Sequence, residues 1–452
     1  MINTDNTIAL DNEWYFFTEE INYSSDEVSL NHKVNLVLVS EEFPPFTPGW
    51  IATYQKTLVH KLQKTWEMWN ITVICKANWG IKEWISDENW VKVIRIKPYF
   101  ENIPFLSETI WYKAKVAMTL IKERKNSKVD VIESPEWNQE LFLYYIYNIL
   151  TFNKNENKKI ALRLHTPLFL TKELNNLEFS LKNKINILME KFLVDNVDTV
   201  TACSQSLVDK MDEIHPMKEN IEIIHNPWND LIFQKNNTYD DIYSLKEDWK
   251  TNILFAWSLE YRKWIDYFCK AMKTILDKNS DAKIVLSGKY WWSENANSKL
   301  SKKEVLAYFN EEDKKRIQFL WLLPYEKMPN VYQHVDICIF PSIYDNYPWV
   351  VIESLLMWKA VIWSKNTWIT EAVDKGIIYI DPTDIESMIN ETQTLLDNPH
   401  KREKMWEIWY KKVKWLNKTN IKQFITYYNK VKSNIITKKE KSKIINFSKV
   451  NN

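Results

Sequence analysis

The chain has 452 residues and a mass of 54.4 kDa, which is enough for two or three domains that each bury a core. Its 60 basic and 59 acidic residues give a net charge of +1, so nothing in the overall charge argues for nucleic-acid binding. The sequence has no apolar run of roughly 18 residues, and it therefore predicts no membrane-spanning helix.

The four cysteines stand far apart in apolar surroundings, and no two of them form a C-x-x-C pair (Cys75, Cys203, Cys269 and Cys338). This pattern favours buried thiols in a reducing cytoplasm over disulfides or a zinc site. The first residues lack a basic segment followed by an apolar one, so no signal peptide is predicted.

Glycine and tryptophan are present in unusual amounts. The chain has 4 Gly and 23 Trp, whereas a protein of this length has about 30 Gly on average. Several tryptophans stand at helix ends, turns and loop corners, where a chain normally uses glycine because only glycine takes a positive φ without steric cost. These are Trp50, Trp66, Trp257, Trp264, Trp291, Trp292, Trp349, Trp358, Trp363 and Trp368.

We hypothesise that many of these tryptophans are UGA codons that the source organism reads as glycine. The alternative is a tryptophan-rich protein that stacks sugars on aromatic rings, which leaves the missing glycines unexplained. Trp111, Trp137 and Trp415 stand where the local pattern does not require glycine.

The N-terminal part begins with a polar extension, residues 1–32, followed by a buried strand at 34–40. A Pro-rich loop then leads into a helix that starts near residue 51. A strand followed by a loop and the N-terminus of a helix can form an anion site. The free backbone N–H groups of the first helical turn point beyond the end of the strand. A simple connecting turn is the alternative interpretation.

Strands and helices then alternate along the chain, which predicts a doubly wound parallel sheet over residues 33–225. The strands are expected at 71–76, 91–96, 129–134, 160–167 and 197–204, and the main helices at 106–124 and 177–194. His165 lies at the end of one strand, where a structural role and a functional role are equally compatible with the pattern.

The α/β pattern restarts in a second domain, residues 226–415. Its first strand, at 253–260, is followed by Arg262 and Lys263, then by a helix. Two cations in such a loop suit a diphosphate, although solvated surface charges are the simpler reading. Residues 416–432 are predicted to form a helix that packs back on the first domain. The basic tail, 433–452, is either a frayed end or a peripheral contact with an anionic membrane surface.

Asp345 and Glu353 stand eight residues apart in the stretch PSIYDNYPWVVIESLLMWKAVI. A strand-like run, 335–340, precedes the first carboxylate, and a helix-like run, 350–357, surrounds the second. Both carboxylates are therefore expected at the carboxyl end of a parallel sheet, where open α/β sheets bind ligands.

The order and spacing of these segments resemble a retaining glycosyltransferase of family 4 over residues 34–432. Asp345 and Glu353 match its E-x7-E signature, and ILFAWSLEYRKWID resembles the segment that carries its donor-binding lysine, here Lys263. TPGWIATY, with Gly49 and Trp50, resembles the glycine-rich loop, and LHTP resembles the segment with its histidine, here His165. The resemblance implies a GT-B fold, in which two Rossmann-like domains face each other.

The resemblance also implies roles for single residues. Lys263, with backbone N–H groups near Gly49 and at Trp349 and Val350, would hold the donor diphosphate without a metal or another cofactor. Asp345 would bind the sugar hydroxyls, Glu353 the ribose, and His165 would orient the sugar; Tyr347 belongs to the same donor-binding segment. Two departures are visible. Asp345 is one methylene shorter than the usual Glu, and Ser258 replaces an arginine, with Arg262 as the neighbouring cation.

The expected activity is transfer of a sugar from a nucleotide sugar to a hydroxyl of a glycan, a lipid-linked sugar or a small molecule, with retention of configuration. Front-side attack, in which the diphosphate takes the acceptor proton, sets this apart from a glycosidase that uses two carboxylates as acid and base. Two alternatives remain open: a hydrolase or phosphorylase of the same fold, and a catalytically silent sugar-binding scaffold.

Overall fold

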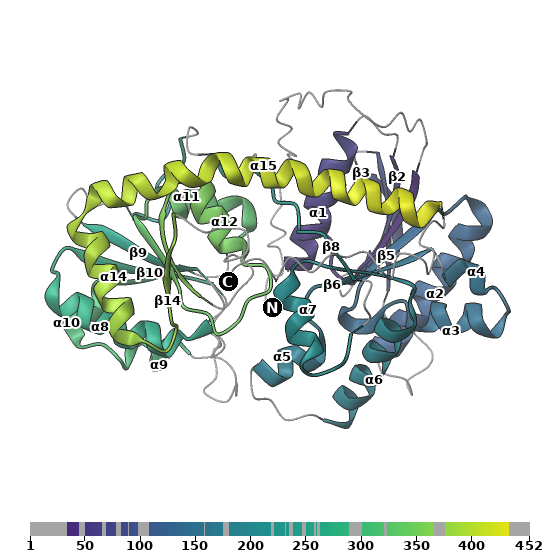
Figure 1. Ribbon diagram of the computed structural model, residues 1–452, viewed down its shortest axis with the longest axis horizontal. Helices are drawn as coiled ribbons and strands as arrows, with labels where there is room; N and C mark the ends of the chain where they lie inside the picture. Colours follow the sequence, from purple (N-terminus) through teal and green to yellow (C-terminus); the bar gives the residue numbers. More distant parts are fainter. Residues whose placement is uncertain are drawn as a thin grey trace, which may run out of the picture.

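The computed structural model forms two α/β lobes that lie side by side, with the long helix α15 running across both (Figure 1). It describes residues 34–44, 50–65, 69–77, 83–88, 90–97, 108–157, 159–174, 180–217, 221–230, 232–234, 238–245, 250–256, 259, 263–288, 301–320, 323–365 and 376–433.

The N-terminal lobe contains a sheet with the strand order β3-β4-β2-β1-β5-β6-β7-β8. All its pairs are parallel except β3 with β4. The strands are β1 (Val34–Val39), β2 (Trp69–Lys76), β3 (Trp84–Glu88), β4 (Val91–Ile96), β5 (Val131–Pro135), β6 (Ile160–Leu164), β7 (Thr199–Ala202) and β8 (Ile221–Ile223). The helical elements of this lobe are α1 (Trp50–Gln63), α2 (Glu108–Asn126), η1 (Trp137–Gln139), α3 (Phe142–Leu150), α4 (Lys154–Asn157), α5 (Leu168–Leu174), α6 (Leu181–Asn196) and α7 (Gln205–Asp212).

The second lobe contains a wholly parallel sheet with the order β11-β10-β9-β12-β13-β14. Its strands are β9 (Thr251–Ala256), β10 (Ala282–Ser287), β11 (Ile317–Leu320), β12 (Ile337–Phe340), β13 (Ala360–Ser364) and β14 (Ile378–Ile380). The helical elements here are α8 (Ile265–Lys278), α9 (Lys302–Leu306), α10 (Glu311–Lys314), η3 (Tyr325–Lys327), α11 (Met328–Gln333), α12 (Trp349–Leu356), α14 (Ile385–Asp397) and α15 (Pro399–Lys432). The predicted doubly wound architecture is confirmed.

The central strands form because their apolar residues are continuous, which suits a sheet covered on both faces. All six residues of β10 are buried, and so are all four residues of β12. Helix α8 instead buries one stripe, with Phe268, Met272 and Ile275 fully covered. Each such apolar side chain contributes about 1.5–3 kcal/mol when buried.

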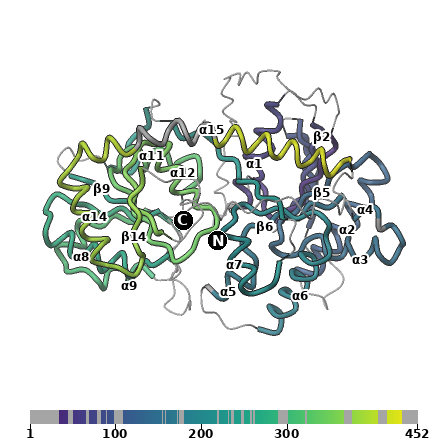
Figure 2. Tube along the Cα trace, in the orientation of Figure 1, coloured from purple at the N-terminus to yellow at the C-terminus, as the bar shows by residue number. Residues whose placement is uncertain are grey.

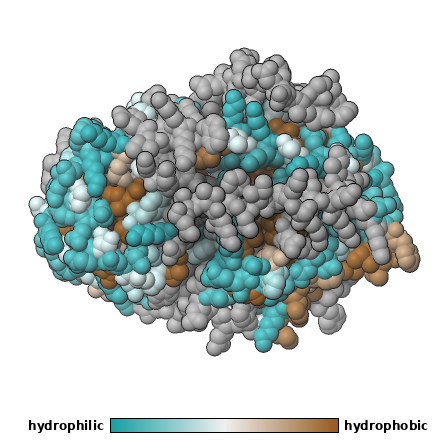
Figure 3. Space-filling view, viewed as in Figure 1, coloured by the Kyte–Doolittle hydropathy of each residue, from teal (hydrophilic) through white to brown (hydrophobic). Residues whose placement is uncertain are grey.

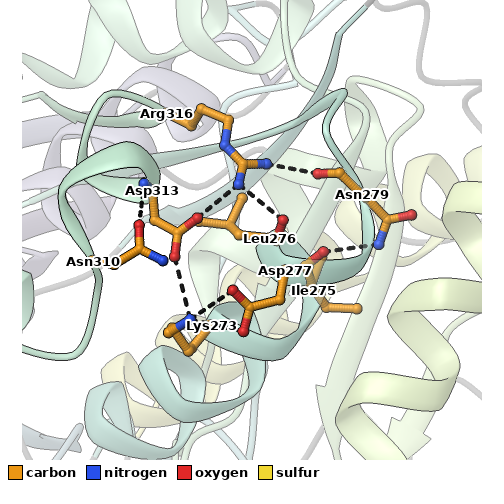
Figure 4. Close-up of polar contacts among 8 residues, drawn as sticks. All are labelled: Lys273, Ile275, Leu276, Asp277, Asn279, Asn310, Asp313 and Arg316. Atoms are coloured by element: carbon orange, nitrogen blue, oxygen red, sulfur yellow. Dashed lines mark hydrogen bonds and ion pairs between the residues drawn. The ribbon is translucent and has the colours of Figure 1, made fainter.

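A polar cluster fastens the far end of α8 to α10 (Figure 4). Arg316 donates to the Leu276 carbonyl at 2.8 Å, to the Asn279 carbonyl at 2.6 Å and to Oδ1 of Asp313 at 2.7 Å. Lys273 reaches the other Asp313 oxygen at 3.5 Å. These contacts hold the C-terminal end of α8, which is opposite to the end that faces the site described below.

Helix α15 joins the two lobes. It packs on α14 and β13 in the second lobe and on α1, β1 and β5 in the first. Figure 2 shows its trace passing over both lobes. Tyr428 near its end donates to Oε2 of Glu133 at 2.7 Å, and Asn417 accepts from the backbone N–H of Trp228 at 3.1 Å. Its last turns therefore belong to the core of the N-terminal lobe.

Three tryptophans take the left-handed backbone conformation, Trp90 (φ 66°), Trp264 (φ 51°) and Trp358 (φ 60°). This conformation costs an L-residue roughly 1–2 kcal/mol, so positions 264 and 358 have the backbone of a glycine site. Trp363 differs from our prediction. It lies inside β13, pairs with Phe340 and Tyr379 and is fully buried, because the strand continues through the expected corner.

The four cysteines are free and buried, as predicted. Among the described helices, none combines the length and the apolar character needed to cross a membrane.

Candidate active site

Lys263 and Asp345 form an ion pair, with Nζ and Oδ2 2.5 Å apart. Their side chains are 1% and 10% exposed. Lys263 follows β9 and Asp345 follows β12, and these strands are neighbours in the parallel sheet. Loops that follow neighbouring parallel strands emerge at the same edge, which explains how two residues 82 positions apart come together.

The loop between β12 and α12 connects this ion pair to the other lobe. Oδ1 of Asp345 accepts the backbone N–H of Tyr347 at 3.1 Å. Between them, Asn346 donates to Oγ1 of Thr166 at 2.9 Å, and the Tyr347 hydroxyl donates to the Asn226 carbonyl at 2.6 Å. These hydrogen bonds, to Thr166 and to the Asn226 carbonyl, hold the loop in place. Asp345 is therefore kept beside Lys263.

Glu353 lies in the middle of α12 and is 5% exposed. Its Oε2 accepts a hydrogen bond from the Tyr332 hydroxyl at 2.8 Å, while burial raises the pKa of the carboxyl to about 7. The structure thus gives the two predicted carboxylates different environments. Asp345 lies beside the cation of Lys263, whereas Glu353 accepts a hydrogen bond from the neutral Tyr332 hydroxyl. The pKa of Glu353 is close to physiological pH.

Two helices begin at the ion pair without a side-chain cap. The residue before α8 is Trp264 and the residue before α12 is Pro348, and neither accepts a hydrogen bond from its helix. In contrast, α6, α7, α9 and α14 are capped by Ser180, Ser204, Ser301 and Asp384. Trp349 and Val350, the first residues of α12, are among the donors left open. Open N–H groups and the helix dipole both favour an anion here.

His165 lies directly after β6 and is fully buried. Its backbone N–H donates to both carboxylate oxygens of Glu136 at 2.9 Å, and its ring meets the ring of Tyr54 edge-on at 4.8 Å. Burial, and next the charge of Arg163, lower the pKa of the imidazole well below its usual range. The imidazole of His165 is therefore neutral. The residue after it, Thr166, accepts the hydrogen bond from Asn346.

Several positioning residues were not predicted from the sequence. Asn346 stands between Asp345 and Tyr347, which were both predicted. Its position in this motif was the one sequence signal that could have indicated its role. Glu136, Tyr332 and Asn226 act through partners that are distant in the chain. Arg163 donates to Oδ1 of Asn226 at 2.7 Å, so it fixes the segment that leads into the second lobe.

Three predicted residues, Gly49, Ser258 and Arg262, lie outside the described residues. Trp50 is the first residue of α1, and its backbone therefore stands at a helix start.

Solved structures with the same arrangement of two lobes are numerous. Sucrose-phosphate synthase from Thermosynechococcus elongatus superposes with a TM-score of 0.69 at 15% identity, covering 89% of this chain and all of the other. The Anabaena protein HepE, solved with UDP and glucose, gives 0.61 at 15% identity and covers 87% of this chain and all of the other. The fold is that of GT-B glycosyltransferases. An α,α-trehalose-phosphate synthase (UDP-forming) from Burkholderia xenovorans, in complex with glucose-6-phosphate, gives 0.63 at 12% identity and covers 87% of this chain and all of the other.

Residues 240–412 of this GT-B chain match the family model described as Glycosyl transferases group 1. This segment contains Lys263, Asp345 and Glu353. The chain is also 22% identical to the uncharacterized glycosyltransferase MJ1607 of Methanocaldococcus jannaschii, over 78% of this chain and 87% of the relative. It is 26% identical to YtcC of Bacillus subtilis over 43% of this chain, and that match spans about half of YtcC, 47%. These matches support a GT-B glycosyltransferase and indicate a transferase.

Proposed function

We propose that the chain is a retaining glycosyltransferase of family 4 that moves a hexose from a nucleoside diphosphate sugar to a hydroxyl acceptor. The observation that carries this proposal is the buried Lys263–Asp345 ion pair beside two uncapped helix starts. The solved neighbours add support, because HepE was solved with UDP-glucose.

The ion pair suits a donor because it places a cation beside a carboxylate. An ammonium attracts phosphate oxygens, and a carboxylate accepts hydrogen bonds from sugar hydroxyls. The starts of α8 and α12 place further N–H groups and positive dipole ends at the same place. No metal or other cofactor is required in this proposal, since these groups carry the charge of the leaving diphosphate.

The reaction follows from this placement. The bond between the anomeric carbon and the diphosphate oxygen breaks, and a bond from that carbon to the acceptor oxygen forms on the same face. The acceptor proton passes to a diphosphate oxygen, so the products are a glycoside and a nucleoside diphosphate. Asp345 binds hydroxyls of the transferred sugar, neutral His165 offers a hydrogen bond without adding charge, and Glu353 binds the ribose.

The first experiment measures donor binding by thermal shift with a panel of nucleoside diphosphates. A ligand at about 100 times its Kd stabilises the folded chain by about 2.7 kcal/mol. Lys263→Ala is expected to abolish the shift. Lys278→Ala, at the exposed far end of the same helix, is the matched control and is expected to keep it.

A second experiment incubates the chain with a labelled nucleotide sugar and an acceptor pool. A labelled glycoside supports the transferase. Free sugar formed at the same rate with and without acceptor would favour the hydrolase, and tight nucleotide binding without any turnover would favour the silent scaffold.

We also propose a peripheral contact of this cytoplasmic enzyme with an anionic membrane surface. Leu181, Ile185 and Leu188 lie on one face of α6 and are 76%, 49% and 67% exposed, with the exposed Lys182 and Lys184 between them. Figure 3 shows hydrophobic surface at the edge of the N-terminal lobe where α3 and α6 lie. Apolar residues flanked by lysines suit the boundary of anionic lipid.

Co-sedimentation with vesicles tests this contact. Leu188→Glu is expected to reduce binding to anionic vesicles, whereas Ile242→Glu, at an exposed apolar residue of the second lobe, is expected to leave it unchanged. Equal sedimentation with neutral and anionic vesicles would contradict the proposal.

A further inference from the structure

The Glu353 carboxylate is bound by a hydroxyl from another helix. Tyr332 lies on α11 and is fully buried, and its hydroxyl donates to Oε2 of Glu353 at 2.8 Å. The Val350 carbonyl is farther from the same hydroxyl, at 3.4 Å, and it accepts the Ser354 hydroxyl at 2.6 Å. A tyrosine hydroxyl has a single proton to donate. The distances therefore assign the Tyr332 proton to Glu353.

Glu353 needs this donor because its carboxylate is buried. A buried carboxylate is costly to charge, and a hydrogen bond to the charged form offsets part of that cost. Burial raises the pKa of Glu353 to about 7, and the hydrogen bond from Tyr332 acts against this rise. The charged form is also the stronger acceptor for hydroxyl groups. Tyr332 thus favours the form of Glu353 that accepts ribose hydroxyls best.

The Tyr332 ring is held by the segment that connects the two lobes. This segment runs between β8 and β9, and its Phe233 is 1% exposed. The Phe233 ring meets the Tyr332 ring edge-on, with the ring centroids 5.9 Å apart. The backbone N–H of Tyr239, in the same segment, donates to Oε1 of Gln333 at 2.6 Å. The connecting segment therefore fixes two adjacent residues of α11, and the Tyr332 hydroxyl has a defined direction.

A second tyrosine in this aromatic cluster lacks such a hydrogen bond. Tyr325, in η3, also packs edge-on against Phe233, with the ring centroids 5.3 Å apart. Its hydroxyl is buried and has no hydrogen-bond partner among the described residues. Phe233 thus packs against two tyrosines, and one of them binds a carboxylate of the candidate site. The other provides a matched control.

We propose that Tyr332 is a positioning residue that sets the selectivity for ribonucleotides, because its hydroxyl holds Glu353 in the orientation that binds both ribose hydroxyls. The inference rests on the proposed function, in which Glu353 binds the ribose. It goes beyond that function by assigning the group that fixes the carboxylate. Hydrogen bonds weaken steeply when distance and angle depart from their preferred values, so a carboxylate that can rotate binds the ribose less well.

The experiment uses calorimetry to compare UDP, ADP, GDP and CDP with their dideoxy counterparts, which lack both ribose hydroxyls. The wild-type chain is expected to bind at least one ribonucleotide at least tenfold more tightly than its dideoxy counterpart. In Tyr332→Phe we expect this affinity ratio to fall at least fivefold, because the affinity for the ribonucleotide falls and the affinity for the dideoxynucleotide does not. Tyr325→Phe removes a hydroxyl from the same cluster and should keep the wild-type ratio.

Kinetics separate positioning from a general structural defect. The diphosphate separates the ribose from the reacting atoms, so ribose contacts are equal in the ground state and the transition state. Their loss raises the donor KM at unchanged kcat. Tyr332→Phe is therefore expected to raise the donor KM at least fivefold, whereas partial unfolding would lower kcat and leave KM unchanged.

Two further variants support this measurement. In a Glu353→Gln background, Tyr332→Phe should change KM less than twofold, because the two residues act as a unit. If Tyr332→Phe does not fold, Phe233→Leu keeps the hydroxyl but loosens the packing of the ring, and it should lower the affinity ratio about threefold.

Three outcomes overturn the inference: equal binding of ribonucleotides and dideoxynucleotides by the wild-type chain, the wild-type ratio in Tyr332→Phe, or an equal fall of the ratio in Tyr325→Phe. In each of these cases nucleotides still bind, so the proposed function stands without this role for Tyr332. If none of the four nucleoside diphosphates binds the wild-type chain, the proposed function fails, and the inference fails with it.

Discussion

Nζ of Lys263 lies 2.5 Å from Oδ2 of Asp345, and both side chains are almost wholly buried. The pair connects the loops after two neighbouring strands, so it has a structural role as well as its proposed role in donor binding. A buried charge that loses its partner is strongly destabilising, whereas removing both charges is often harmless.

A double-mutant cycle separates these two roles. Lys263→Met and Asp345→Asn are each expected to lower the free energy of unfolding by about 3–5 kcal/mol, because the remaining charge is left buried. The double variant is expected to regain most of that stability and none of the turnover. Urea unfolding and a transfer assay measure the two effects. Single variants as stable as the wild type would show that the pair is not buried in solution.

Donor binding is expected to depend on pH through Glu353. The folded pKa of about 7 lies above the ordinary 4.5, so the folded chain holds this proton more tightly than the unfolded chain does. The contribution to stability is full below about pH 4.5 and is lost as pH rises to about 7. The charged form accepts stronger hydrogen bonds from ribose hydroxyls, so nucleotide affinity should increase through pH 7.

Calorimetry between pH 6 and pH 8, at roughly constant ionic strength, measures this dependence. Glu353→Gln should bind more weakly and remove the pH dependence, whereas the exposed Glu386→Gln should retain it. An unchanged profile in Glu353→Gln would assign the titration to another group.

Tryptophans beside the ion pair are expected to limit access to it. Trp349 is 9% exposed and stands on the first turn of α12, and its indole N–H is buried without a hydrogen-bond partner. Trp349→Gly should expose the helix start and increase nucleotide affinity. Trp111→Gly, on α2 of the other lobe, should leave nucleotide affinity unchanged. Weaker binding in Trp349→Gly would instead support the aromatic stacking alternative.

The backbone at Trp358 tests the glycine hypothesis directly. Its φ of 60° suits glycine, so Trp358→Gly is expected to stabilise the chain or leave its stability unchanged. Trp363 is fully buried in β13, and Trp363→Gly is expected to cost at least about 3–5 kcal/mol through the cavity that it leaves. Thermal unfolding measures both. Peptide masses of the natively expressed protein decide the hypothesis, and a tryptophan mass at position 264 would refute it.

The contact between Asn346 and Thr166 is expected to matter for turnover more than for stability. It connects the Asp345 loop to the residue after His165, 180 positions away. Asn346→Ala should lower kcat at least tenfold, because a small displacement of a positioned group is costly in catalysis. Asn330→Ala removes a similar amide from an exposed contact and should have no such effect. Equal kcat values in the two variants would contradict the positioning role.

Local pattern alone was sufficient for much of the fold. Continuous apolar runs such as residues 34–39 and 337–340 predicted buried parallel strands, and alternation with helices predicted two doubly wound units. Strands and helices can be predicted in this way because side-chain periodicity and β-branched composition are local signals, visible within a few consecutive residues. The same local reading assigned Lys263, Asp345 and Glu353 to loops or helices at strand ends, since each follows a recognisable strand.

Only the tertiary structure decided which of these groups meet. Lys263 pairs with Asp345, Glu353 with Tyr332, Glu136 with the backbone of His165, and Tyr428 near the end of α15 with Glu133 on β5. Strand order, burial and crossing loops set these contacts, and they depend on residues far apart in the chain.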